Sequence, residues 1–249
     1  MTNITDIHTH VLPGIDDGAP DWNICRQMLI QSYKSGVDSI IATPHYLPWE
    51  KNASAARIRR LCQRVQEQIR EEKGIAINIY PGQEIYYHGD IVESLKTGKA
   101  LTLADSRYVL VEFSSGESYS TIKRAIHHLR EAGYIPIIAH VERYQSIRKP
   151  DGKQESRSAG LKELYDLGAL FQMNTEVLQL GTFHQTGRWA RKALEQKQIH
   201  FLASDMHNLK TRPPITKEQL CWIRKHLDRD YQNSILYGNA VEIVGQWVQ

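Results

Sequence analysis

Two pairs of residues with metal-binding side chains stand near opposite ends of the chain. His8 and His10 lie two positions apart near the start. Asp205 and His207 repeat that spacing near the end. On a β-strand such residues project to the same side, and imidazole and carboxylate groups bind zinc, manganese and iron. The two pairs therefore predict that a first and a last strand meet around metal, as in a metal-dependent hydrolase.

Further ligand-type side chains follow or end apolar, β-rich runs of the sequence. These residues are His45, Glu84, Glu112 and His140. Read alone, Glu112 is more often a surface carboxylate, although its apolar neighbours favour a site. Asn174 also ends such a run, but it suggests no ligand role. Six of seven run ends carry ligand types, a pattern that chance rarely produces, so we expect these side chains to converge.

The elements that must position these side chains alternate along the chain. Seven β-rich runs are expected at 4–8, 39–43, 76–80, 108–113, 135–139, 169–174 and 200–203. Amphipathic, helix-like segments lie between most of them, at 21–35, 53–73, 121–132, 161–167, 186–198 and 216–227. Alternation of this kind predicts a parallel α/β sheet. About seven units in 249 residues favour a barrel, whose strands open with their carboxyl ends on the catalytic face.

Nothing in the composition divides the chain, so we predict a single domain spanning residues 1–249. The polar run at 149–153 is interpreted as a loop rather than a linker. Hydrophobic content of 41% and charged content of 24% are typical of a soluble globular protein. The net charge of +3 is too small to indicate nucleic-acid binding.

The three cysteines suggest neither a disulfide framework nor thiol chemistry. Cys25, Cys62 and Cys221 are scattered and odd in number. A cysteine-based tyrosine phosphatase needs Arg six residues after Cys, where this chain has Gln31, Gln68 and Leu227. No signal-peptide pattern and no apolar stretch of about 20 residues is found, so we expect a cytoplasmic protein without stable membrane insertion.

Six short motifs together resemble the PHP (polymerase and histidinol phosphatase) superfamily. They read DIHTH, TPH, GQEIYY, VEF, IAHVERY and ASDMHN. More narrowly, the chain is similar to the bacterial manganese-dependent protein-tyrosine phosphatases of capsule and exopolysaccharide operons, from Asp6 to the C-terminal helix. The resemblance implies a distorted (β/α)7 TIM-like barrel. It also implies a centre of three divalent ions, with Mn²⁺ expected and Fe or Zn as alternatives.

The resemblance also implies how nine ligands are divided among the three ions. The first ion would take His8, His10, Glu84 and Asp205. The second would take Glu84 as a bridge, Glu112 and His140. The third would take Asp17, His45 and His207. By itself, Asp16-Asp17-Gly18 also reads as a simple turn, and only Asp17 of the two carboxylates is carried over as a ligand.

The charge of such a centre suits a phosphate monoester. Four carboxylates facing three divalent ions leave an excess of two positive charges, which a phosphate dianion balances. The ions would lower the pKa of a water toward neutrality and hold the phosphoryl oxygens. Arg143 and Arg212 each lie a few residues beyond a ligand and are the predicted catalytic residues, because guanidinium pairs bidentately with phosphate. We expect them to bind phosphate and not metal.

The preferred hypothesis is a phosphotyrosine-protein phosphatase acting on a bacterial tyrosine kinase that controls polysaccharide export. A phenol, with a pKa of about 10, leaves more readily than an alkanol. Three alternatives remain open: a small-molecule phosphatase such as one acting on histidinol phosphate, a nucleic-acid processing enzyme, and a non-catalytic metal-binding module. Four aromatic residues follow ligands closely and are read either as a phenol-accepting rim or as packing: Tyr46, Trp49, Tyr86 and Tyr87.

Overall fold

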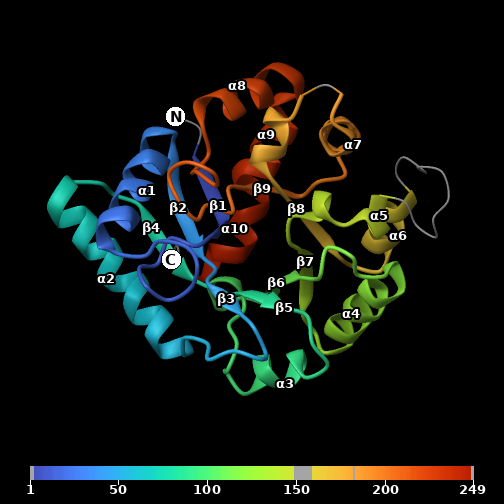
Figure 1. Cartoon of the computed structure of the whole chain (residues 1–249), viewed down its shortest axis with the longest axis horizontal. Helices are drawn as coiled ribbons and strands as arrows, with labels where there is room; N and C mark the ends of the chain where they lie inside the picture. Colours follow the sequence, from blue (N-terminus) through green and yellow to red (C-terminus); the bar gives the residue numbers. More distant parts are fainter. Residues whose placement is uncertain (1–2, 149–158, 182, 248–249) are drawn as a thin grey trace.

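Parallel strands at the centre of the molecule are surrounded by helices (Figure 1). This computed structural model describes residues 3–148, 159–181 and 183–247. Most of the polar run at 149–153, together with its expected loop structure, lies outside the described residues. The mixed α/β class expected from the sequence is confirmed, with a curled parallel sheet.

Nine strands are found in the described part of the chain. They are β1 (Ile4–Thr9), β2 (Val37–Ala42), β3 (His45–Tyr46), β4 (Asn78–Pro81), β5 (Glu84–Tyr86), β6 (Tyr108–Glu112), β7 (Ile135–Ile138), β8 (Leu170–Asn174) and β9 (Phe201–Ala203). Their order is β1-β2-β4 in one sheet and β3-β5-β6-β7-β8-β9 in the other. Every strand pair is parallel, so all carboxyl ends face the same way.

The first and last strands meet, as the two ligand pairs predicted. A parallel bridge joins Thr9 to Met206. The backbone N–H of Asp205 donates to the His8 carbonyl at 2.9 Å, and that of His10 donates to the Met206 carbonyl at 3.0 Å. These bonds bring the two ends of the chain's ligand set to the same place.

His45 and Glu84 are not placed quite as the sequence suggested. Both were expected beyond the ends of strands, but they open the short strands β3 and β5 and pair with each other in register. Pro44 has no N–H to donate and interrupts the path from β2 to β3. Gly82 lies between β4 and β5, where the backbone packs so closely that a Cβ would lie 3.0 Å from side-chain atoms of Ile41 and Leu103.

Helices enclose the strands over most of the circumference (Figure 1). The α-helices of the described part are α1 (Trp22–Lys34), α2 (Ala55–Lys73), α3 (Ile91–Lys96), α4 (Tyr119–Glu131), α5 (Gln145–Arg148), α6 (Ala159–Asp166), α7 (Gln185–Glu195), α8 (Lys217–His226), α9 (Arg229–Asn233) and α10 (Asn239–Val244). The six predicted helices are confirmed to within a few residues. Among the described helices, none combines the length and apolar character that a membrane crossing requires.

Side-chain caps define where the long helices begin. Asp21, Ser54, Ser118 and Thr216 each accept a hydrogen bond from a backbone N–H in the first turn of α1, α2, α4 and α8. Such caps satisfy donors that the helix itself leaves unpaired. Thr216 also forms a capping box with Gln219.

Buried apolar side chains cover both faces of the curled sheet in the described part of the chain. Along β6, Val109 and Val111 pack outward toward the helices, whereas Leu110 belongs to a second cluster inside the curl. Ile243 of α10 joins that inner cluster. The Tyr108 hydroxyl, at the start of β6, donates to Glu242 of α10 at 2.6 Å. Helix α10 therefore fills the amino-terminal end of the curl, and the buried ligands gather at the opposite end.

Candidate metal centre

All nine predicted metal ligands converge at one end of the curled sheet. The ligand atoms form three overlapping groups, each with all its atoms within 4.8 Å of one another. The first group is His8, His10, Glu84 and Asp205; the second is His45, Glu84 and Glu112; the third is His10, Asp17, His45 and His207. Glu84 belongs to two of them, which agrees with the bridging position expected for it.

The grouping differs in two details from the expected division. His45, and not His140, shares the compact second group with Glu84 and Glu112. His140 nevertheless lies beside it, with Nε2 at 2.8 Å from Glu84 Oε1 and 3.6 Å from Glu112 Oε2. His10 joins the third group as well as the first. Sequence spacing cannot resolve such sharing, because one imidazole lies between neighbouring groups.

Four buried ligand atoms have no hydrogen-bond partner. They are His45 Nδ1, Glu84 Oε2, Asp205 Oδ1 and His207 Nε2. Buried polar atoms of proteins are normally hydrogen-bonded, and exceptions need an explanation. Here the atoms without a hydrogen bond are all good metal donors within the three ligand groups, and two of them, His45 Nδ1 and Glu84 Oε2, face each other at 3.1 Å. The residues present therefore fit divalent cations.

Three histidines are oriented so that Nε2 faces the centre. The Nδ1–H of His8 donates to Gln172 Oε1 at 3.0 Å, and that of His10 donates to Asp16 Oδ2 at 2.8 Å. The Nδ1–H of His207 donates to the Asp205 carbonyl oxygen at 2.9 Å. Since each acceptor is an oxygen, each bond keeps the proton on Nδ1. The Nε2 lone pair is then free for a cation, as in metal sites whose outer partners set the tautomer.

Gln172 and Asn174 on β8 are functional residues that the sequence reading missed. The Gln172 carbonyl oxygen also accepts the backbone N–H of His140 at 2.7 Å, while its amide donates to Asn174 Oδ1 at 2.8 Å. The Asn174 amide in turn donates to Asp205 Oδ2 at 2.8 Å. The sequence pattern could have revealed them, because Gln172 and Asn174 are polar, stand two positions apart in an apolar strand and therefore project from the same face.

Asp16 supports the centre from the turn that carries Asp17. Besides accepting from His10, it accepts the backbone N–H of Gly18 at 3.0 Å and of His45 at 3.3 Å. Gly18 lies so close to His10 that a Cβ would stand 2.1 Å from the His10 carbonyl oxygen. Asp17 itself has a 64% exposed side chain, and its Oδ1 lies 3.3 Å from Nε2 of both His45 and His207. The turn therefore presents Asp17 at the open edge of the centre.

The electrostatics of the cluster strongly favour bound positive charge. Burial alone would lower the histidine pKa values, but the surrounding carboxylates reverse this. Asp16 and Glu84 raise the pKa of His10 to about 9, Asp17 and Glu112 raise that of His45 to about 11, and Glu112 and Glu84 raise that of His140 to about 9. Conversely, the histidines outweigh burial and hold the pKa of Glu84 well below its usual value.

Both predicted phosphate-binding arginines reach the centre, at its edge. Arg143 Nη2 lies 3.0 Å, and Arg212 Nη2 2.6 Å, from the same oxygen of Asp205, Oδ2. Arg143 also lies 3.6 Å from Glu176. The other Asp205 oxygen, Oδ1, faces the histidines, 3.4 Å from His8 Nε2. The sequence predicted the location of these arginines but not their shared contact with a metal ligand.

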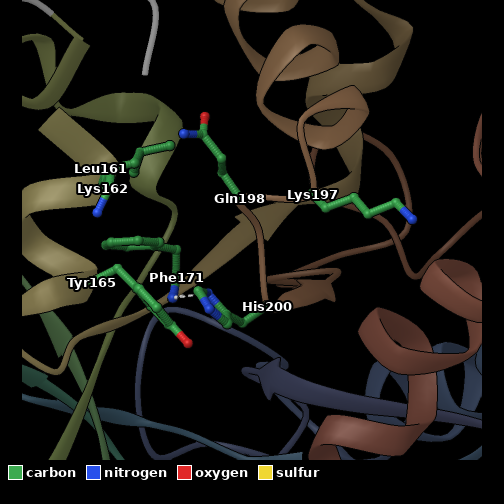
Figure 2. A pocket seen from close by; sticks show the side chains of 7 residues that line it. All are labelled: Leu161, Lys162, Tyr165, Phe171, Lys197, Gln198 and His200. Atoms are coloured by element: carbon green, nitrogen blue, oxygen red, sulfur yellow. Dashed lines mark hydrogen bonds between the residues drawn. The ribbon is translucent and has the colours of Figure 1, made fainter. Parts of the chain in front are cut away.

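A separate cavity of about 320 Å³ lies at the amino ends of β8 and β9 (Figure 2). Its walls include Tyr165 and His200, whose rings stack at 5.2 Å, while Lys162 pairs with Asp166 and Lys197 with Asp228. Burial lowers the pKa of His200 to about 4, so this imidazole is neutral. With no carboxylate among its lining residues, this cavity is unsuited to metal.

Comparison with known proteins agrees with the geometry. A family model described as capsular polysaccharide synthesis, CpsB/CapC, matches residues 4–245. The tyrosine-protein phosphatase CpsB of Streptococcus pneumoniae is 31% identical over 244 residues, covering 96% of this chain and 97% of the relative. The tyrosine-protein phosphatase YwqE of Bacillus subtilis is 34% identical over 221 residues, covering 88% and 84%.

Solved structures extend the comparison. The chain matches a structure from a study of YwqE and CpsB, described there as unique metal-dependent tyrosine phosphatases, with a TM-score of 0.85, 31% identity and coverage of 97% and 94%. A variant of an organophosphorus hydrolase from Deinococcus radiodurans matches with a TM-score of 0.60 at 13% identity, covering 97% and 92%. The second likeness shows the fold alone.

Proposed function

The chain belongs to the CpsB/CapC family of capsular polysaccharide synthesis proteins, and on this premise we propose that it is a metal-dependent tyrosine-protein phosphatase. The observation that carries the proposal is the convergence of nine ligand side chains, four of them with a buried donor atom that lacks a hydrogen bond. Burial also raises the pKa of Cys25 to about 12, so that thiol is unsuited to act as a nucleophile.

The proposed cofactor is a set of three divalent ions, with Mn²⁺ preferred. Three overlapping ligand groups support that number, and mixed imidazole and carboxylate donors suit manganese, iron and zinc. The ligands are those named from the sequence, with His45 and His10 shared between groups. Bound there, the ions would supply an activated water near neutral pH and neutralise the phosphoryl oxygens.

The protein's own side chains have separate proposed tasks around the phosphoryl group. Arg143 and Arg212 bind its outer oxygens as charge-assisted donors, while Asp205 holds both guanidinium groups at the edge of the centre. Gln172 and Asp16 keep His8 and His10 in the tautomer that presents Nε2. These tasks orient substrate and ligands before reaction, so little reorganisation is needed during it.

The finer description of the fold is a distorted (β/α)7 barrel in a single domain spanning residues 1–249. Two observations support it. Strands β2 and β3 are separated only by Thr43 and Pro44, and β4 and β5 only by Gly82 and Gln83, so each pair counts as one interrupted strand. The Thr9–Met206 bridge joins the first strand to the segment after the last.

The proposed substrate is phosphotyrosine on a bacterial tyrosine kinase that controls capsule or exopolysaccharide synthesis. The names of the curated relatives support phosphotyrosine as the substrate group, and the description of the family supports a place in capsule synthesis. The proposed compartment is the cytoplasm, where a kinase has access to ATP. Three cysteines without disulfide bonds are in keeping with a reducing compartment.

A paired-peptide assay tests the proposed function. The protein is stripped of metal, reloaded with Mn²⁺ and assayed on two peptides that differ only in carrying phosphotyrosine or phosphoserine. We expect metal-dependent release of phosphate from the phosphotyrosine peptide and much slower release from the other. Equal rates on both peptides, or activity that survives complete chelation, would contradict the proposal.

A further inference from the structure

Two aromatic side chains near the metal centre contact each other, and one of them is largely exposed to solvent. The rings of Trp49 and Tyr86 meet edge to face, with centroids 4.7 Å apart and planes at 76°. Trp49 is 62% exposed, and Tyr86 is half-buried. We call these two residues the aromatic pair. Exposed aromatic groups beside a polar site are typical of ligand-binding surfaces.

The other two aromatic residues of this region are already engaged in packing. Tyr46 is buried, stacks on His88 at 5.9 Å and donates its hydroxyl hydrogen bond to Ser94 at 3.3 Å. Tyr87 packs on Phe113 with ring centroids 5.4 Å apart. Of the four candidates for a rim, Trp49 is the exposed residue, and Tyr86 is the one whose ring it contacts.

The backbone places Tyr86 of the aromatic pair farther along its strand than the ligand Glu84. Tyr86 stands two positions after Glu84 on β5, so both side chains project from the same face of the strand. The spacing along the strand is about 6.6 Å, from roughly 3.3 Å per residue. Tyr86 is also the register partner of Glu112 on β6. A substrate whose phosphate lies among the ligands would thus extend outward past Tyr86.

The turn that carries Trp49 is held in place by one side chain. The Asn52 amide oxygen accepts the backbone N–H of Leu47 at 2.7 Å, while its nitrogen donates to the carbonyls of Leu47 at 2.8 Å and Glu50 at 3.1 Å. A further backbone bond joins Glu50 to Leu47 at 3.0 Å. Trp49 is therefore presented on an ordered turn, at little conformational cost on binding.

We propose that the aromatic pair is the subsite that receives the phenyl ring of phosphotyrosine. The inference rests on the proposed phosphatase function and goes beyond it by assigning the selectivity for an aryl phosphate to two residues. Edge-to-face and offset contacts between rings stabilise such a complex beyond the burial of area. The short alkyl stem of phosphoserine has no ring and gains none of these contacts.

The test compares a ring-bearing ligand with one that has none. Trp49→Ala and Tyr86→Ala, loaded with Mn²⁺, are assayed on a phosphotyrosine peptide, with inorganic phosphate as a competitive inhibitor. We expect KM for the peptide to rise about 2- to 12-fold per ring, the range for one aromatic contact, and the inhibition constant of phosphate to stay unchanged. Trp49→Phe should restore most of the affinity.

Tyr33→Ala is the matched control, because Tyr33 is another exposed aromatic residue, at 44%, on α1 near the amino end of β2. It should behave as the wild type. Unchanged KM in both alanine variants would overturn the subsite, as would an equal loss of phosphate inhibition, which would mean that the turn supports the metals. If the wild type itself does not cleave the peptide, the proposed function fails instead, and the two failures are thus distinguished.

Discussion

At the scale of single residues, Asp205 divides its carboxylate between two tasks. Oδ1 faces the imidazoles of the candidate centre, and Oδ2 accepts from Asn174, Arg143 and Arg212. One side chain thus joins the proposed metal ligands to the proposed phosphate binders. This joint position was invisible in the sequence, where the arginines were recognised only by their distance from a motif.

Removing one arginine should therefore affect catalysis more than metal content. In Arg143→Ala or Arg212→Ala, Asp205 keeps Asn174 and the remaining guanidinium, so metal should stay bound. We expect kcat/KM to fall by about 30- to 1000-fold, the cost of a lost charge-assisted contact to the reacting group, with only partial recovery in Arg→Lys. The measurements are metal analysis and steady-state kinetics on one phosphotyrosine peptide. Loss of metal in proportion to activity would assign both arginines to the metal site.

His10→Ala, in contrast, should lose metal as well as activity. His10 belongs to two of the three ligand groups, so its loss should reduce metal content and lower kcat/KM by more than the roughly 100-fold that loss of an outer partner costs. The fold should survive, because the apolar core lies elsewhere. Circular dichroism, metal analysis and kinetics check this, with His127→Ala on the exposed face of α4 as control. Wild-type metal content in His10→Ala would contradict the ligand assignment.

At the scale of elements, β8 acts as a scaffold for ligands that lie on other strands. Gln172 accepts hydrogen bonds from both His8 and His140. Gln172→Ala should leave His8 free to change tautomer and lower metal affinity by about 10- to 100-fold, without removing any ligand. Competition with a fluorescent chelator measures the affinity. An unchanged affinity would show that neither histidine depends on Gln172.

The long elements were predictable, and the interruptions between them were not. Runs such as 108–113 and the capped helices carry periodicity over many residues, and β6 and α4 appear near their expected bounds. Strand β3 has two residues and β5 three, too few for a pattern to show. Pro44 and Gly82, which lie at the breaks, read in the sequence only as turn residues. Helices α3, α9 and α10 were not predicted for the same reason, because each has only five or six residues.

At the scale of the whole molecule, the metal-free protein should become less stable as pH rises. The folded-state pKa values of His10 and His140, about 9, and of His45, about 11, lie above the ordinary value of 6.5. Raised pKa values stabilise the fold fully below about pH 6.5, and that contribution is lost as pH rises through 9 to 11.

Thermal unfolding between pH 6.5 and pH 10 tests whether the stability of the metal-free protein falls as pH rises. We expect Tm of the metal-free protein to fall over that range, by about 2–4 °C for each kcal/mol lost. The metal-loaded protein should show no comparable fall, because bound cations replace the protons on the histidines. A metal-free Tm that rises with pH would contradict the assigned ion pairs.

The curled parallel sheet was predictable because the positions of the ligands and the pattern of strands both indicate it. His8 and Asp205 indicated that the chain's two ends meet, and the structure joins them by the Asp205 N–H to His8 carbonyl bond. The sharing of His45 and Glu84 between groups depends on ångström-scale distances. Such distances follow from packing between strands, which no spacing along the chain encodes.

The meeting of β1 and β9 also governs when the site comes into existence during protein synthesis. Asp6 accepts the backbone N–H of Ser204, 198 positions later. At roughly 5–20 residues per second of translation, β1 waits on the order of 10–40 s for this partner. Until then a nascent chain offers His8 and His10 without Asp205, an incomplete nest of ligands. In the proposed metal-dependent enzyme, cations would therefore bind in one of the last steps of biosynthesis, and a chain truncated before residue 204 should leave the ribosome without them.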